Sequence, residues 1–153
     1  MPVAATLTPR AQQQVSTLRA RDRKAYDHFL VALRTRGCES LHYRLTGEGL
    51  LERLCVVHLA RQLRVVVAFE SVEAVTTLLV GLHSNDPFLD VYTQLYALAG
   101  IGQIPSEPRR KPPCCDNDGL PPEVGTAILD DLVKQARELS GADKRRTRRV
   151  GHR

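Results

Sequence analysis

Short apolar runs alternate with polar breaks through the middle of the chain. Residues 54–59, 63–69 and 74–82 are rich in Val, Leu, Phe and Thr, and polar residues bound each run. Runs of this length and composition are typical of β-strands. Because only three residues separate the first two runs, we expect these strands to be antiparallel neighbours joined by a tight turn.

The short turn also predicts which residues lie opposite each other in this hairpin. If Leu59 faces Leu63, then His58 lies opposite Arg64, and the two share one face of the sheet. The other face is bulkier and uncharged, and it carries Cys55, Val57, Leu59, Val65, Val67 and Phe69. We expect that bulkier face to pack on the core, which leaves an imidazole beside a guanidinium on the opposite one.

Helical spacing of apolar residues predicts two helices before the strands. Thr8-Pro9 is typical of a helix start, so the first helix is expected from Pro9 to about Ala20. A second helix is expected at residues 23–35, capped by Asp22 and ended by Gly37. Such a helical hairpin would pack on one face of the sheet.

A further strand and a short helix complete the predicted domain, residues 1–100. Residues 41–46 alternate apolar and polar side chains, and Gly47-Glu48-Gly49 is expected to form the turn after them. Following the last strand, Asp86 is expected to cap a helix at residues 87–98. The predicted class is therefore α+β, with two N-terminal helices packed on a small antiparallel sheet and a short closing helix.

Three segments follow this domain. Residues 101–120 are predicted to be a Pro-rich linker, and residues 121–141 a C-terminal helix with Val124, Ile128 and Leu132 on its apolar side. That helix either docks on the domain or binds a partner. Residues 142–153 are expected to be a disordered basic tail.

The formal net charge of +5 is concentrated in this tail, since the last ten residues hold six basic and no acidic ones. The tail is either a polyanion-binding arm, with ribosomal RNA one candidate, or simply a solvated end. No apolar run reaches the length of a membrane span, so we expect a cytoplasmic protein without a membrane partner. Its four cysteines lack zinc-like spacing and are expected to be reduced thiols, with no metal or other cofactor.

The predicted order of elements resembles the RelE/ParE superfamily, the toxins of bacterial toxin–antitoxin pairs. The architecture matches over about residues 1–100, and the likeness is most specific in residues 43–98. There the run LCVVHLARQLRVVVAFES is similar to the family's hairpin leading to an arginine, and VTTLLVGLHSNDPFLDVYTQL to its last strand, polar loop and tyrosine-bearing helix. The resemblance implies an antitoxin partner. It also implies either metal-free mRNA cleavage on the ribosome, as in the RelE branch, or gyrase inhibition, as in the ParE branch.

The resemblance also implies which residues form the site. Arg64 matches the arginine that opens the second hairpin strand, and His58 falls near a lysine of the preceding strand. Tyr92 matches the tyrosine of the family's closing helix, and His83 lies where the family often has a basic residue after the last strand. The family's lysine pair on the first hairpin strand is missing here, so cleavage by this chain would be a histidine-based variant of the chemistry.

RNA cleavage of this type needs a base for the 2′-hydroxyl, positive charge for the phosphate and a proton donor for the leaving 5′-oxygen. Our leading hypothesis is a RelE-like endoribonuclease whose phosphate charge is stabilised by Arg64. The acid and base candidates are His58, His83 and Tyr92, and the phosphate contacts are Arg44 and Arg61. The alternative is a non-catalytic protein on the same fold, either a gyrase inhibitor or an RNA-binding or decayed toxin.

Overall fold

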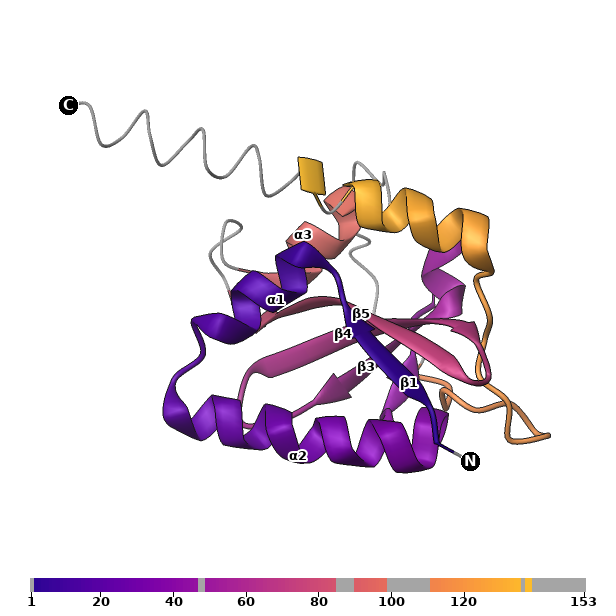
Figure 1. The fold of residues 1–153 in the computed structure, drawn as a ribbon, viewed down its shortest axis with the longest axis horizontal. Coiled ribbons are helices and arrows are strands. Elements are labelled where there is room, and N and C mark those ends of the chain that lie inside the picture. The colour runs from indigo at the N-terminus through magenta and orange to yellow at the C-terminus, as the bar shows by residue number, and fades with distance from the viewer. Residues whose placement is uncertain (1, 47–48, 85–89, 99–110, 136, 139–153) are drawn as a thin grey trace.

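The protein is described here by a computed structural model with an α+β architecture, which confirms the predicted broad class (Figure 1). The structure describes residues 2–46, 49–84, 90–98, 111–135 and 137–138. Outside the described residues lie the Gly47-Glu48 pair of the predicted turn, Asp86-Pro87, residues 101–110 of the predicted linker and the basic tail. In the described part of the chain, no helix is both long and apolar enough to cross a membrane.

A five-stranded mixed sheet in the order β1-β5-β4-β3-β2 forms the centre of the fold. The strands are β1 (Ala4–Leu7), β2 (Tyr43–Arg44), β3 (Leu54–His58), β4 (Leu63–Ser71) and β5 (Ala74–Leu82). Strand β1 pairs in parallel with β5, and the other pairings are antiparallel. The sequence analysis missed β1, because a four-residue edge strand at the start of the chain is too short to show a pattern.

The β3–β4 hairpin has the predicted register. His58 pairs with Arg64, Val56 with Val66 and Leu54 with Ala68. The turn between the strands is tight enough that Arg61 adopts a positive φ of 47°. This register puts alternate residues of both strands on opposite faces of the sheet, as expected.

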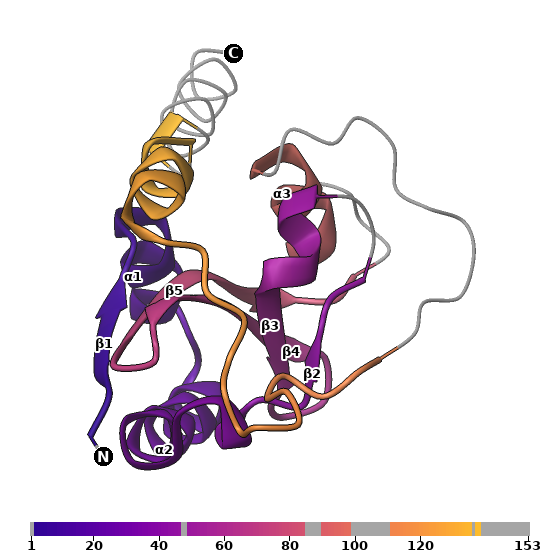
Figure 2. The same cartoon turned by 90° about the vertical axis from the view of Figure 1, so that its right-hand side faces the viewer.

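The two N-terminal helices lie on one side of the sheet (Figure 2). Helix α1 (Pro9–Ser16) is capped by Thr8, whose hydroxyl oxygen accepts from the Ala11 N–H at 3.0 Å. Helix α2 (Ala20–Arg36) begins earlier than predicted, so Asp22 lies in its first turn and Arg19 occupies the N-cap position instead. Its end at Gly37, where φ is 58°, is as predicted.

The first core lies between these helices and the sheet face that the sequence assigned to it. Phe29 and Leu33 of α2 pack with Val65 and Val67 of β4, and all four are buried. The prediction that Val65 and Val67 face the helices is therefore confirmed.

The opposite face of the sheet is also covered, which the sequence analysis did not expect. Val56 and Val66 have no exposed surface and belong to a second core. Helix α3 (Val91–Leu98) packs there, with Val91, Leu95 and Leu98 buried. Both faces of the central hairpin are thus apolar, which explains why its sequence is almost continuously hydrophobic.

The C-terminal helix docks on this second core. Residues 126–135 are helical, and the chain before them bonds to β4 through the Val124 N–H and the Phe69 carbonyl oxygen at 2.8 Å. Leu129 and Leu132 are buried, but Ile128 is 37% exposed. The prediction that Ile128 faces inward was therefore wrong, because the docked stripe begins one residue later.

The expectation of four reduced thiols was wrong as well. Cys38 pairs with Cys115 and Cys55 with Cys114, with Cα atoms 5.4 and 5.7 Å apart. The paired cysteines are 77 and 59 residues apart in sequence, so only the tertiary fold brings them together. Both bonds tie residues 111–120 to the domain, within the segment predicted to be a linker. Figure 2 shows this stretch, in orange, running beside the sheet and past the end of α2.

Docking of the C-terminal helix predicts unequal effects of two substitutions within it. Leu132→Ala should lower the free energy of unfolding by about 2–4 kcal/mol, because it removes a fully buried side chain. Ile128→Ala, the matched control on the same helix, should cost about 1 kcal/mol or less, because that side chain is partly exposed. Urea unfolding of both variants measures the difference, and equal small losses would show that the helix is not docked.

Candidate functional site

Histidine and tyrosine side chains gather where β3 ends, on the face of the second core. We call His42, Tyr43, His58, His83 and Tyr92 the His–Tyr cluster. The Tyr43 hydroxyl lies 2.9 Å from His58 Nε2 and 2.9 Å from the Tyr92 hydroxyl. The His83 ring packs edge-on against Tyr92, with centroids 5.0 Å apart. Three predicted site residues, His58, His83 and Tyr92, are therefore joined in one cluster.

Local structure explains how these side chains meet. Tyr43 pairs with Val56, two residues before His58 on the same face of the sheet. His83 follows the end of β5 and is held there by its N–H, which donates to the Gln62 carbonyl of the hairpin turn at 2.8 Å. Tyr92 lies in the first turn of α3. The cluster thus draws on four elements of the fold.

Arg64 lies beside this cluster but is buried, with only 9% of its surface exposed. Its Nη1 donates to the carbonyls of Arg61 and Leu63 at 3.0 and 3.2 Å, while its buried Nε has no hydrogen-bond partner. The hairpin register predicts the face of the sheet on which Arg64 lies, but not its burial. In the structure it is a fixed positive charge at the start of β4.

The pKa of His58 is lowered from 6.5 to about 4. Burial of the ring is the largest cause, and the positive charge of Arg64 is the next. Smaller contributions come from His42, Lys111 and His83. His58 is therefore neutral at pH 7, so its imidazole is available as a proton acceptor.

The second predicted histidine, His83, has a different partner. Its Nδ1 lies 2.9 Å from Oδ1 of Asp90, a carboxylate that is 6% exposed. Burial would raise the pKa of Asp90, but hydrogen bonds from the Ser84 N–H, His83 and Thr93 together lower it. Asp90 is thus ionised and orients the His83 ring, much as a carboxylate orients a catalytic histidine. Asp90 also caps α3, because its Oδ2 accepts from the Thr93 N–H at 3.0 Å.

A lysine reaches the cluster from the segment predicted to be a linker. Lys111 Nζ lies 5.3 Å from the centroid of the Tyr43 ring, within cation–π range. Its charge also contributes to the lowered pKa of His58. The sequence alone gave no reason to place Lys111 here, since it is 53 positions after His58 in a Pro-rich stretch.

The two predicted phosphate contacts lie apart from the cluster's hydrogen bonds. Arg44 pairs with Cys55 and so shares the opposite face of the sheet. Arg61 is exposed in the hairpin turn, where its carbonyl accepts from Arg64. Tyr43 is a residue of the cluster that the sequence did not single out, although its pattern could have done so. It lies between the polar residues His42 and Arg44 in a strand, which predicts that its ring points toward the core.

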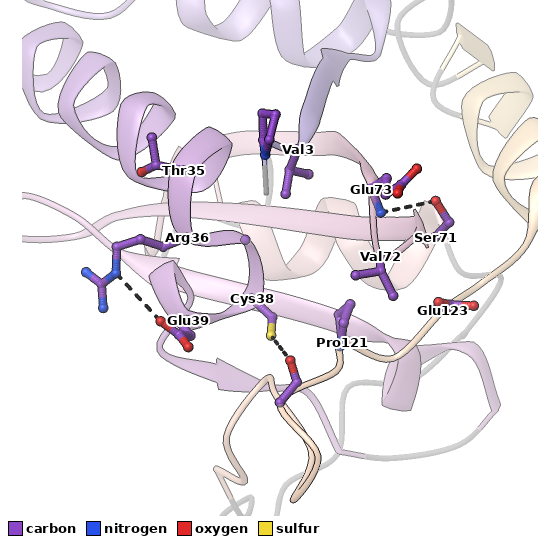
Figure 3. Close-up of a pocket in the computed structure, with 13 residues that line it drawn as sticks. Val3, Thr35, Arg36, Cys38, Glu39, Ser71, Val72, Glu73, Pro121 and Glu123 are labelled. Atoms are coloured by element: carbon purple, nitrogen blue, oxygen red, sulfur yellow. Dashed lines mark hydrogen bonds and ion pairs between the residues drawn. The ribbon is translucent and has the colours of Figure 1, made fainter.

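A separate pocket of about 500 Å³ lies at the other end of β4 (Figure 3). It is lined by Pro2, Val3, Thr35, Arg36, Gly37, Cys38, Glu39, Ser71, Val72, Glu73, Gly119, Pro121 and Glu123. Among these described lining residues there is no His, Lys or Tyr, and one arginine stands against three glutamates. A polyanion would meet net negative charge there, so the pocket is a poorer candidate for RNA than the His–Tyr cluster.

No group of three or more His, Cys, Asp or Glu side chains in the described part of the chain is placed to hold a metal ion. No protein-family model matches the chain, and no curated protein has significant sequence similarity to it.

The environment of His58 predicts its titration. The His58 ring should titrate by NMR with a midpoint of about 4, and Arg64→Gln should raise that midpoint toward 6.5 by removing a nearby positive charge. Because the unfolded chain binds this proton near pH 6.5, His58 should make the folded protein less stable as pH falls from 6.5 to 4. A midpoint near 6.5 in the wild type would contradict the buried, positively charged environment.

Proposed function

We propose that the protein is a RelE-like toxin of a bacterial toxin–antitoxin pair that cleaves mRNA on the ribosome by metal-free acid–base chemistry. The observation that carries the proposal is the His–Tyr cluster, in which the Tyr43 hydroxyl bonds both His58 and Tyr92. It provides proton acceptors and donors within hydrogen-bond reach of one another, beside fixed positive charge. General acid–base catalysis uses such groups when they lie within hydrogen-bond reach of the substrate atoms that lose and gain protons.

The two histidines divide the proposed proton transfers between them. Neutral His58, linked through Tyr43 to Tyr92, is the proton acceptor for the 2′-hydroxyl that attacks the phosphate. His83, oriented by Asp90, donates the proton to the leaving 5′-oxygen. Removing one proton and supplying another on either side of the phosphorus are the two transfers that this cleavage needs.

Arg64 has a modified role in this proposal. Its burial and its bonds to the hairpin carbonyls leave it as a fixed charge rather than a flexible phosphate clamp. A preorganised charge stabilises a pentavalent phosphate without needing to reorganise during the reaction. The same charge helps to keep His58 neutral, so Arg64 supports both the base and the transition state.

The order of elements also supports the proposal. After the additional strand β1, two helices precede a short strand, three antiparallel strands and a closing helix, and the resemblance rests on this part of the order. The alternative, a non-catalytic gyrase inhibitor or RNA-binding protein on the same fold, does not require the linked His58, Tyr43 and Tyr92. We therefore rank cleavage first, with the cytoplasm, a cognate antitoxin, ribosomes and mRNA as its proposed setting and partners.

The nuclease proposal predicts ribosome-dependent cleavage that persists in EDTA. Purified protein added to programmed ribosomes should leave mRNA fragments ending in a 2′,3′-cyclic phosphate or 3′-phosphate. His58→Ala should lower the rate by about 100-fold or more, because it removes the proposed base. Expression of the wild type, but not of this variant, should arrest bacterial growth.

His28→Ala is the matched control, because His28 is an exposed residue of α2 on the other side of the sheet. It should cleave at the wild-type rate. Equal rates for His58→Ala and the wild type would remove the cluster from the mechanism. Inhibition of gyrase supercoiling without RNA cleavage would favour the alternative function.

The basic tail predicts a salt effect that is separate from catalysis. Its six basic residues should raise affinity for ribosomal RNA by releasing counterions, so deletion of residues 144–153 should flatten the slope of log affinity against log salt. The shortened protein should still cleave RNA at low salt, because the proposed chemistry lies in the folded domain. If the deletion leaves binding unchanged at every salt concentration between about 50 and 200 mM, the tail is only a solvated end.

A further inference from the structure

Lys111 is the one lysine in the described part of the chain that the structure shows in contact with the His–Tyr cluster. It is exposed, so its ammonium faces solvent as well as the Tyr43 ring. A phosphate held at Tyr43 and His58 would therefore have a mobile positive charge next to it, in addition to the buried charge of Arg64. Lysine acts as a point charge on phosphate and needs no fixed geometry.

The position of Lys111 depends on two covalent bonds. Cys114 joins Cys55 of β3, and Cys115 joins Cys38 in the 3₁₀ turn after α2 (Gly37–Ser40). Besides these bonds, the Arg44 N–H donates to the Pro112 carbonyl at 2.7 Å. Both disulfides begin within four residues of the lysine, so they hold it over the cluster.

Little else anchors the stretch around these cysteines. Residues 116–120 are all exposed, and the Asp116 carboxylate bonds the Asp118 and Leu120 N–H groups within its own turn. Without the disulfides, residues 111–120 would keep little buried apolar area to hold them in place. The second core contains no residue of this stretch, and the first contains only Cys114, with Cys115 packed against it, so most of both cores lies outside residues 111–120.

We propose that Lys111 binds the substrate phosphate in the candidate site and that the two disulfides switch this binding on by oxidation. The inference rests on the function proposed above and adds a binding residue and a means of regulation. In the oxidised protein Lys111 is held at the cluster. In the reduced protein residues 111–120 are released, and the lysine leaves with them.

The chemistry of the switch is thiol–disulfide exchange with a dithiol reductant. A thiolate of the reductant attacks one sulfur and forms a mixed disulfide, and its second thiol then releases the protein cysteine. Each bond takes up two electrons and two protons, and the reductant becomes a cyclic disulfide. Opening both bonds thus consumes two dithiols. Disulfides in a cytosolic protein are usually of this transient, redox-sensing kind, which fits a cytoplasmic toxin whose activity rises when it is oxidised.

The test compares oxidised protein with protein kept in excess dithiothreitol. Reduction should slow RNA cleavage about 10- to 100-fold, because it removes one stabilising charge from the phosphate. Lys111→Ala in the oxidised state should lose a similar factor, and reduction of this variant should cause little further loss. Lys111→Arg should keep most of the activity. Lys24→Ala, which changes an exposed lysine of α2, should behave as the wild type.

A second measurement separates this inference from the proposed function. Binding of an oligonucleotide with a 2′-deoxy residue at the cleavage position should weaken on reduction and in Lys111→Ala, whether or not the RNA form is cleaved. Absence of cleavage with this binding pattern intact would overturn only the nuclease function. Equal activity and binding in both redox states would overturn the switch. So would an undiminished effect of reduction in Lys111→Ala, or loss of the circular dichroism of the folded domain on reduction.

Discussion

The register between β3 and β4 determines the composition of both apolar cores and the surroundings of the candidate site. Side chains alternate along a strand, so a slip of one residue would exchange the two faces of the hairpin. The observed register puts Val65 and Val67 in the first core and Val56 and Val66 in the second. It also sets His58 directly opposite Arg64 at the open end. One constraint therefore fixes both cores and the electrostatic environment of the candidate base.

The candidate site is built from segments that are far apart in the sequence. The central hairpin contributes His58, β2 contributes Tyr43, and α3 contributes Tyr92. Tyr43 and Tyr92 also pack on the second core, so apolar contacts as well as hydrogen bonds fix the two hydroxyls beside His58. Lys111 differs, because covalent bonds and not core packing hold it. This difference makes it the part of the site most open to regulation.

The sequence predicted what depends on local pattern. The three central strands, the Thr8 cap and the Gly37 stop follow from periodicity and backbone preference, and the structure has all of them. The second core was missed because segments after residue 90 cover that face of the sheet, and no local pattern reveals where such segments dock. The disulfides were missed for the same reason. Pairings across 59 and 77 residues depend on the topology of the fold. The expected cytoplasmic location led to the wrong prediction that all four cysteines are reduced.

The two histidines show that the proposed base and acid can be told apart only by their surroundings in the folded protein. From sequence, His58 and His83 are equivalent candidates for acid or base. In the structure His58 is half-buried near a buried guanidinium, and burial and positive charge both disfavour its protonated form. His83 instead lies against an ionised carboxylate, because its Nδ1 is 2.9 Å from Oδ1 of Asp90, which orients the ring. Environments that separate two otherwise identical groups are how one site supplies a base and an acid at the same pH. The different partners of the two rings, Tyr43 for His58 and Asp90 for His83, are what give them different roles in the proposed chemistry.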